Sequence, residues 1–193
     1  MKRIPAALVL LRALCGPALV GVVVAGGSGR VAAVLVTVAF LSDVFDGIIA
    51  RRIGVATERL RRADTLADTA FYACAAVALY ARAPGVLRAN AAGLAVLLAL
   101  EVGRLALERR KYGRLASYHM WSAKAWGIAL WLGFSEAFLT QRAGPLFTAA
   151  VVVGVVADLE GLAASLVLST WRHDIRTVWE AVQVERAAGR RSC

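Results

Sequence analysis

Two pairs of aspartates carry the clearest chemical signal in this sequence. Asp43 and Asp46 are three residues apart and Asp64 and Asp68 are four apart, so each pair lies on one face of a helix. Both pairs adjoin long apolar runs, where unpaired carboxylates are costly and need a counter-charge. Two sources are open: arginines of the 51–62 connection, or a divalent cation such as Mg²⁺ or Mn²⁺, which prefers carboxylate and phosphate oxygens.

Small residues continue the face of the first aspartate pair. Gly47 and Ala50 follow Asp46 by one and four residues. They either leave room for a ligand beside the acids or allow close packing of membrane helices. Arg12 interrupts the first apolar run, and its role also has two possible interpretations. It either approaches the acids or extends its charged end to the lipid headgroups.

The elements that must position these residues are long apolar runs. The chain is 60% hydrophobic and only 19% charged, whereas soluble domains average about 25% charged residues. A bilayer-spanning helix needs roughly 20 apolar residues, and these runs lack the alternation of membrane strands. We therefore expect an all-α, polytopic membrane protein with about six transmembrane helices, at 5–25, 30–50, 64–82, 85–107, 118–140 and 145–170.

The distribution of Lys and Arg predicts the orientation in the membrane. Basic residues concentrate at both chain ends and in the connections 51–63 and 108–117, and the connections between them hold few. The positive-inside rule then places both termini and the aspartates on the cytoplasmic side of the cell's inner membrane. A basic face beside anionic headgroups also accounts for the net charge of +10. Because no nucleic-acid-binding motif occurs, we expect no nucleic-acid partner.

The chain divides by composition into two parts. Residues 1–170 form one expected transmembrane domain. Residues 171–193 form a basic cytoplasmic tail in which apolar and charged residues alternate. The tail is either a helix lying at the membrane surface or an irregular segment.

The spacing from Asp43 to Asp68 resembles the signature of the CDP-alcohol phosphatidyltransferases, D-x2-D-G-x2-A-R-x8-G-x3-D-x3-D. The matching residues are Asp43, Asp46, Gly47, Ala50, Arg51, Asp64 and Asp68. The one departure is Leu60, which stands where the signature has its second glycine.

The resemblance implies transfer of a phosphatidyl group from a CDP-linked lipid, such as CDP-diacylglycerol, to an alcohol, with release of CMP. It implies a two-metal site with Mg²⁺ or Mn²⁺ held by Asp43, Asp46, Asp64 and Asp68. Asp68 is also the expected catalytic base for the acceptor hydroxyl. Gly47, Ala50 and Arg51 are the expected donor-binding residues, and a homodimer is the expected assembly.

Arg104 and Lys124 are the candidate acceptor-binding residues. Both lie within or at the edge of apolar runs, where the positive-inside rule explains a basic residue poorly. A phosphorylated acceptor, such as glycerol 3-phosphate or an inositol phosphate, would use such cations.

Two alternatives stay open at this point. Leu60 could mark a relative with altered specificity or no catalysis, because the signature glycine lies close to the bound nucleotide. The aspartates could instead bind the ion of a membrane transporter, although ion sites of transporters more often lie at mid-membrane on broken helices.

Overall fold

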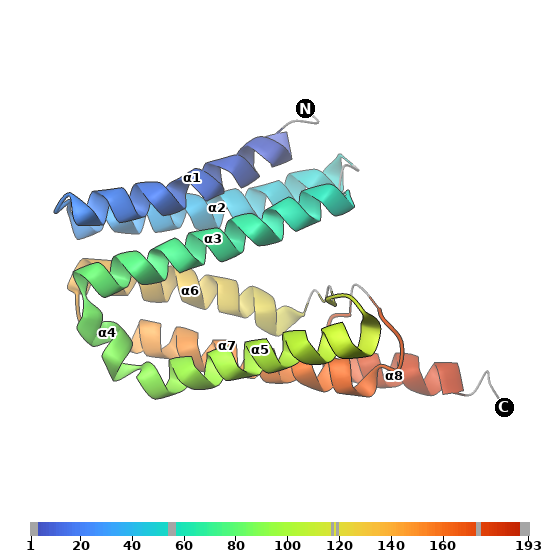
Figure 1. Ribbon diagram of the computed structural model, residues 1–193. Helices are drawn as coiled ribbons and strands as arrows, with labels where there is room; N and C mark the ends of the chain where they lie inside the picture. The colour runs from blue at the N-terminus through green and yellow to red at the C-terminus, as the bar shows by residue number, and fades with distance from the viewer. Residues whose placement is uncertain (1–3, 54–56, 117, 119, 173–174, 190–193) are drawn as a thin grey trace. The chain divides into compact units, whose positions relative to one another are not determined.

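The described residues form eight helices joined by short connections. In this computed structural model the structure describes residues 4–53, 57–116, 118, 120–172 and 175–189, without the side chains of residues 51, 58, 59, 61 and 62. The helices are α1 (Ile4–Val24), α2 (Gly29–Arg52), α3 (Glu58–Arg82), α4 (Pro84–Ala89), α5 (Ala91–Tyr112), α6 (Trp121–Thr140), α7 (Pro145–Val167) and α8 (Val178–Gly189) (Figure 1). Helix accounts for 85% of the chain and the described ranges contain no strand, so the all-α prediction is confirmed.

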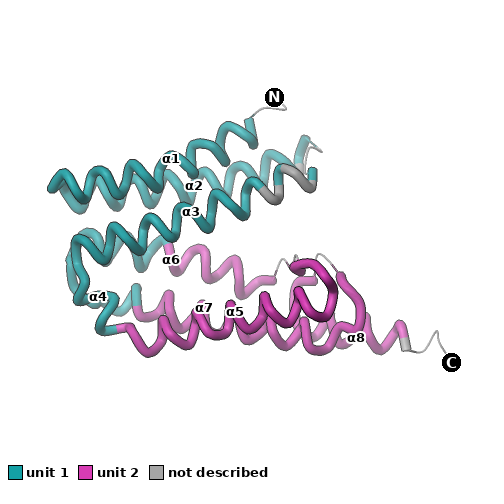
Figure 2. The backbone as a smooth tube through the Cα atoms, viewed as in Figure 1, with its two compact units in different colours: residues 1–89, 131–147 teal, residues 90–130, 148–193 magenta. Residues whose placement is uncertain are grey.

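The chain folds as two compact units, and the residues of each unit contact mainly one another. The first unit comprises residues 1–89 and 131–147, and the second comprises residues 90–130 and 148–193 (Figure 2). Within the first unit, α1 packs along both α2 and α3, whereas α2 and α3 contact each other far less. Helix α1 is therefore the element that relates the two aspartate-bearing helices.

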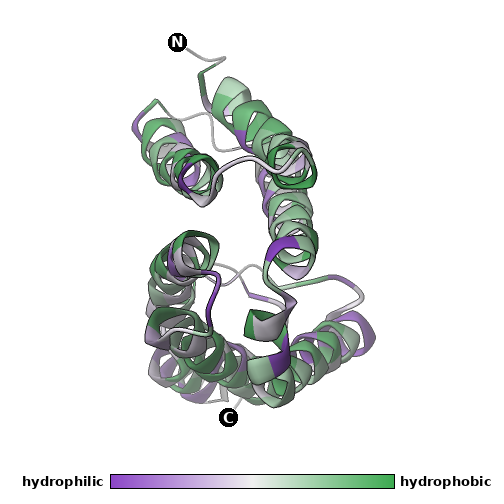
Figure 3. Cartoon of the chain, turned by 90° about the vertical axis from the view of Figure 1, so that its left-hand side faces the viewer, coloured by the Kyte–Doolittle hydropathy of each residue, from purple (hydrophilic) through white to green (hydrophobic). Residues whose placement is uncertain are grey.

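Three helices are long and apolar enough to cross a bilayer, namely Ile4–Val24, Gly29–Ala50 and Pro145–Val167. Large apolar side chains such as Leu10, Val34 and Val152 are more than half exposed. Most of the helical ribbon is coloured as hydrophobic (Figure 3), and exposed apolar side chains are expected where a helix contacts lipid.

The apolar run expected at 85–107 is divided into two helices. Helix α4 ends at Ala89 and α5 begins at Ala91, with Asn90 between them at φ −106° and ψ 12°. Asn is a weak helix former in a helix interior and favours boundaries, which accounts for the break.

Aromatic residues join α2 and α3 to the second half of α6 within the first unit. The ring of Trp131 stacks on Phe40 with centroids 4.9 Å apart, and its indole N–H donates to Thr37 Oγ1 at 3.0 Å. Phe134 contacts Tyr72 of α3 and Phe147. These aromatic contacts give the first unit a packed core.

Helix α8 is held against the second unit by one face. Ala181 and Ile175 are buried with Met120, Ala164 and Leu168. At its start, Thr177 Oγ1 accepts from Glu180 N–H (3.1 Å) and Glu180 Oε2 accepts from Arg176 N–H (2.8 Å). These two bonds differ from a capping box only in that Glu180 accepts from the residue before the N-cap, and they satisfy two backbone N–H groups at the start of the helix.

The second acid of α8 also contacts the backbone. Ser169 N–H donates to Glu185 Oε2 at 3.1 Å, and hydrogen bonding from Ser169 lowers the pKa of Glu185. The exposed residues are Arg172 and Arg176, which precede α8, and Trp179, Gln183, Arg186 and Ala187 within the helix. We call this set the outward face of α8; it is basic and carries one large aromatic side chain.

Candidate active site

The four aspartates converge on the guanidinium of Arg12. Arg12 Nη1 donates to Asp43 Oδ1 at 2.8 Å and also to Asp68 Oδ1. Arg12 Nη2 donates to Asp64 Oδ1 at 2.8 Å and also to Asp46 Oδ2. Each terminal nitrogen thus bonds one aspartate from α2 and one from α3, so the fork of the guanidinium ties the two helices together.

Local sequence explains how these five side chains meet. The i, i+3 spacing on α2 and the i, i+4 spacing on α3 turn each aspartate pair to one side of its helix. Arg12 lies in the apolar α1, which packs against both, and its side chain is 1% exposed. The long, planar guanidinium can donate hydrogen bonds to several carboxylates at once, which a lysine ammonium does less well.

The four aspartates differ in their exposure to solvent. Asp46 is 6% exposed, whereas Asp43, Asp64 and Asp68 are 34–46% exposed. Three of the four acids are therefore accessible from outside the helix bundle.

The three open acids fit a divalent cation. Asp43, Asp64 and Asp68 each offer a carboxylate oxygen, and these oxygens lie within 4.8 Å of one another. Carboxylate oxygens at such separations suit a hard cation such as Mg²⁺, Mn²⁺ or Ca²⁺. The donor chemistry and the closeness of the three carboxylates both support a metal site here, and they do not distinguish among these ions.

The expected donor-binding residues follow the aspartates along α2. Gly47 is half-buried and Ala50 is buried. The backbone of Arg51 belongs to α2, and its side chain lies outside the described part of the structure. Most of the arginines expected as counter-charges also have side chains outside the described part of the structure, namely Arg59, Arg61 and Arg62. Among the described side chains, Arg12 bonds all four aspartates.

Leu60 lies in the first turn of α3 and is half-buried. Its backbone N–H donates to Oγ1 of Thr57, the N-cap of the helix, at 3.2 Å. A residue in this helical conformation does not need glycine for its backbone. The replacement of the signature glycine therefore changes the space at this point of the chain without straining the fold.

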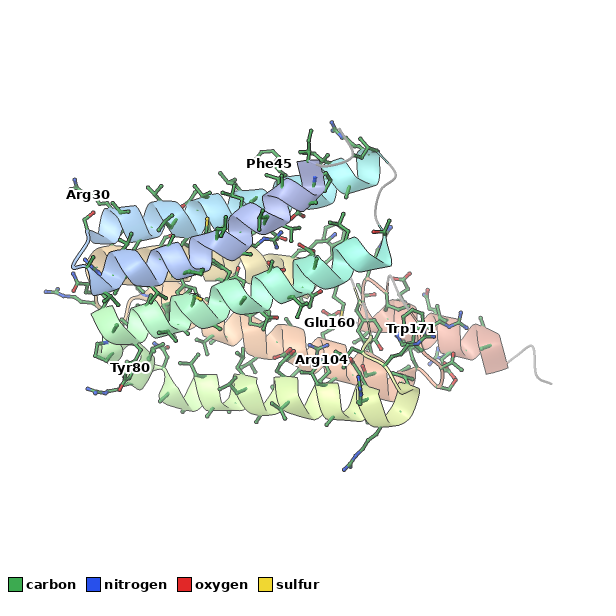
Figure 4. All side chains as sticks on the ribbon, turned by 45° about the horizontal axis from the view of Figure 1, so that its top comes forward. Arg30, Phe45, Tyr80, Arg104, Glu160 and Trp171 are labelled. Carbon is green, nitrogen blue, oxygen red and sulfur yellow. The ribbon has the colours of Figure 1, made fainter. Side chains whose placement is uncertain are left out.

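The expected acceptor-binding residues both belong to the second unit. Arg104 Nη2 donates to Glu101 at 2.5 Å and Nη1 to Glu108 at 3.4 Å, while Nε lies 3.7 Å from Asp158 Oδ1 (Figure 4). Lys124 Nζ lies 4.2 Å from the centre of the Trp121 ring. Arg104 is thus surrounded by acids, and binding an acceptor phosphate would require it to leave part of this network.

Glu108 is the centre of a buried network that the sequence alone did not reveal. Its side chain is fully buried, and it accepts hydrogen bonds from Ser165 Oγ and from Ala116 N–H, both at 2.9 Å. Glu108 therefore fixes the segment after α5 to the end of α7. Glu108 directly precedes the basic cluster 109–111, and nothing in this sequence pattern indicated that it would be buried.

Comparison with known families agrees with the geometry. The family model of the CDP-alcohol phosphatidyltransferases matches residues 2–169, which is most of the chain, and the chain belongs to this family. No curated protein and no solved structure gives a match.

Membership defines the class of activity. The family consists of membrane-bound transferases of substituted phosphate groups that act in phospholipid biosynthesis, with a CDP-alcohol as donor and an alcohol as acceptor. Divalent metal use is typical of the family, in keeping with the open acids of the site. The chain is therefore a membrane transferase of lipid synthesis.

Proposed function

We propose that this chain transfers the phosphatidyl group of CDP-diacylglycerol to a phosphorylated alcohol and releases CMP. The observation that carries the proposal is the convergence of Asp43, Asp46, Asp64 and Asp68 from two helices onto one point. Their spacing along the chain matches the signature of the family to which the chain belongs.

The four aspartates are the proposed ligands of a two-metal site with Mg²⁺ or Mn²⁺. When bound, such ions stabilise negative charge on the attacking and leaving oxygens of a phosphoryl displacement. The side chain of Asp46 is only 6% exposed, whereas those of the other three acids are 34–46% exposed, which suggests that the four acids have unequal tasks. Asp46 would anchor the site, and the three open acids would face the substrates.

Asp68 is the proposed catalytic base. The acceptor hydroxyl oxygen attacks the phosphorus that bears the diacylglycerol, the bond from that phosphorus to the oxygen of CMP breaks, and the hydroxyl proton passes to Asp68. A carboxylate can take that proton only within hydrogen-bond reach of the hydroxyl. The 38% exposure of Asp68 leaves it accessible to an incoming alcohol.

Gly47 and Ala50 are proposed to line the cytidine site, with Arg51 holding donor phosphate. Leu60 would then narrow this site or change the pose of the donor. Arg104 and Lys124 are proposed to bind the phosphate of the acceptor, such as glycerol 3-phosphate or an inositol phosphate. That role would explain two cations that lie in otherwise apolar runs.

The proposed arrangement in the membrane has six spans, both termini and the site on the cytoplasmic side of the inner membrane, and a homodimeric assembly. Residues 1–170 would form the catalytic transmembrane domain. Residues 171–193 would form a basic tail whose helix α8 lies at the membrane surface. The basic outward face of α8 supports this placement, because anionic headgroups attract such residues.

The test is CMP release from CDP-diacylglycerol by the purified chain with Mg²⁺ or Mn²⁺, measured against a panel of acceptors. We expect release to depend on a phosphorylated alcohol and to fall about 10²–10⁴-fold in Asp68→Asn. Arg104→Gln and Lys124→Gln should raise KM for the phosphorylated acceptor and not for the donor. If no acceptor elicits CMP release, or if Asp68→Asn is fully active, the proposal is wrong.

A further inference from the structure

Arg12 bonds each of the three carboxylates that could hold a metal ion together. The three acids whose oxygens lie within 4.8 Å of one another are Asp43, Asp64 and Asp68, and Arg12 donates to each of them. A divalent cation such as Mg²⁺ binds carboxylate oxygens at about 2.1 Å. Because a guanidinium and a divalent cation repel each other, the two cannot both bond these oxygens closely.

We infer that Arg12 is an exchangeable counter-cation, which neutralises the aspartates until a divalent cation binds and then gives up its bonds to Asp43, Asp64 and Asp68. The inference rests on the proposed function only in its use of a metal at these acids. The inference adds that Arg12 weakens metal binding. A residue that only held the aspartates in position would strengthen metal binding instead.

The accessibility of the acids that Arg12 contacts supports exchange over a fixed structural role. The two terminal nitrogens of Arg12 bond all four acids, and its Nε is buried without a hydrogen-bond partner among the described residues, as are the Nε atoms of Arg82 and Arg104. Three of its four partners are also more than a third exposed, so a cation can reach them without opening the core.

Asp46 differs from the other three and indicates where Arg12 would remain attached. It is 6% exposed, and it is not among the three acids that can share one ion. When the exposed acids pass to the metal, the Arg12–Asp46 pair can persist inside the helix bundle. The side chain would then shift its position without leaving a buried charge unpaired.

The experiment measures binding of Mn²⁺ alone to the full chain in lipid nanodiscs, with free Mn²⁺ read from its paramagnetic resonance signal and no donor or acceptor present. The variants are Arg12→Gln and Arg12→Lys, and the matched control is Arg82→Gln. Arg82 is also partly buried in the first unit, but it donates to a backbone carbonyl, that of Gly27, at 2.7 Å.

We expect Arg12→Gln to bind Mn²⁺ severalfold more tightly than the wild type, because the competing cation is gone. Arg12→Lys should be intermediate, since one ammonium cannot bond all four acids, and Arg82→Gln should match the wild type. Equal or weaker Mn²⁺ binding by Arg12→Gln would overturn the inference. If Arg12→Gln does not fold, the same comparison with Arg12→Lys decides: tighter binding than wild type supports competition and equal or weaker binding refutes it.

The outcomes separate this inference from the proposed function. If neither the wild type nor any variant binds Mn²⁺, the metal site and the inference fail together. If the chain binds Mn²⁺ in the expected order but releases no CMP, the proposed reaction fails and the competition stands. If CMP is released but Arg12→Gln binds Mn²⁺ less tightly than the wild type, only the competition fails.

Discussion

Arg12 and Asp46 form the most deeply buried ion pair of the aspartate site, with side chains 1% and 6% exposed. The pair joins the middle of α1 to the end of α2 across 34 residues of sequence. Removing one partner of a buried pair leaves the other charge uncompensated, which is more costly than removing both. The stability of the first unit should therefore depend strongly on Arg12.

Arg12→Met is expected to destabilise the protein by about 3–5 kcal/mol when no divalent cation is added, the usual cost of breaking a buried ion pair. The matched change Arg82→Met removes a single hydrogen bond to a backbone carbonyl and should cost about 1–2 kcal/mol. Thermal unfolding in detergent with a chelator measures both. Equal losses for the two variants would show that the acids do not depend on Arg12.

Asp64→Asn is expected to stabilise the protein in the presence of a chelator while it impairs catalysis. The change removes one of four crowded negative charges, and asparagine Oδ1 can still accept the bond from Arg12. We expect a gain of about 1 kcal/mol together with a loss of about 10²–10³-fold in CMP release. Asp43→Asn should behave in the same way. A lower unfolding temperature than that of the wild type for both variants would contradict the charge argument.

Leu60→Gly is expected to lower KM for the CDP-linked lipid severalfold, because it opens space at the first turn of α3. Gly should also cost about 1 kcal/mol of stability relative to Ala in a helix. Leu60→Ala is the matched control, since it shortens the side chain without that backbone cost. If KM for the donor is unchanged in both variants, Leu60 does not restrict the donor site.

The outward face of α8 is expected to lie at the depth of the lipid headgroups. An environment-sensitive dye on Trp179→Cys should report a less polar setting in nanodiscs with anionic lipid than in zwitterionic ones, where electrostatic attraction is absent. Trp179 is 64% exposed, so labelling should not disturb the core. Adding Arg176→Gln and Arg186→Gln should reduce the difference between the two lipids. If the dye reports the same polarity in anionic and zwitterionic nanodiscs, α8 does not lie at the membrane surface.

Sequence patterns predicted the helices and the acids of this site well, because both depend on local spacing. The apolar runs set the helix positions to within a few residues, apart from the break at Asn90 and the earlier start of α3 at Glu58. The i, i+3 and i, i+4 spacings of the aspartates are also local, so their shared helix faces could be expected from the residues alone.

The counter-charge could not be assigned from sequence because it comes from a distant helix. Arg12 is 31 to 56 residues from the acids that it contacts, and its two possible roles had the same sequence pattern. A basic residue in the middle of an apolar run was the available signal, since such residues usually face a bundle interior and serve a function. Glu108 was missed for a related reason: its partners Ser165 and Ala116 become neighbours only through tertiary packing.

The position of α1 between α2 and α3 has a consequence for how the protein is made. Because α1 precedes both acid-bearing helices in the chain, Arg12 is synthesised before all four aspartates. Insertion of the helices in chain order would bring each aspartate pair to a cation that is already present, which would reduce the cost of bringing carboxylates into lipid. Moving the segment of α1 behind α3 by circular permutation would remove that order, and it would expose the nascent α2–α3 hairpin to the membrane with its negative charges unopposed.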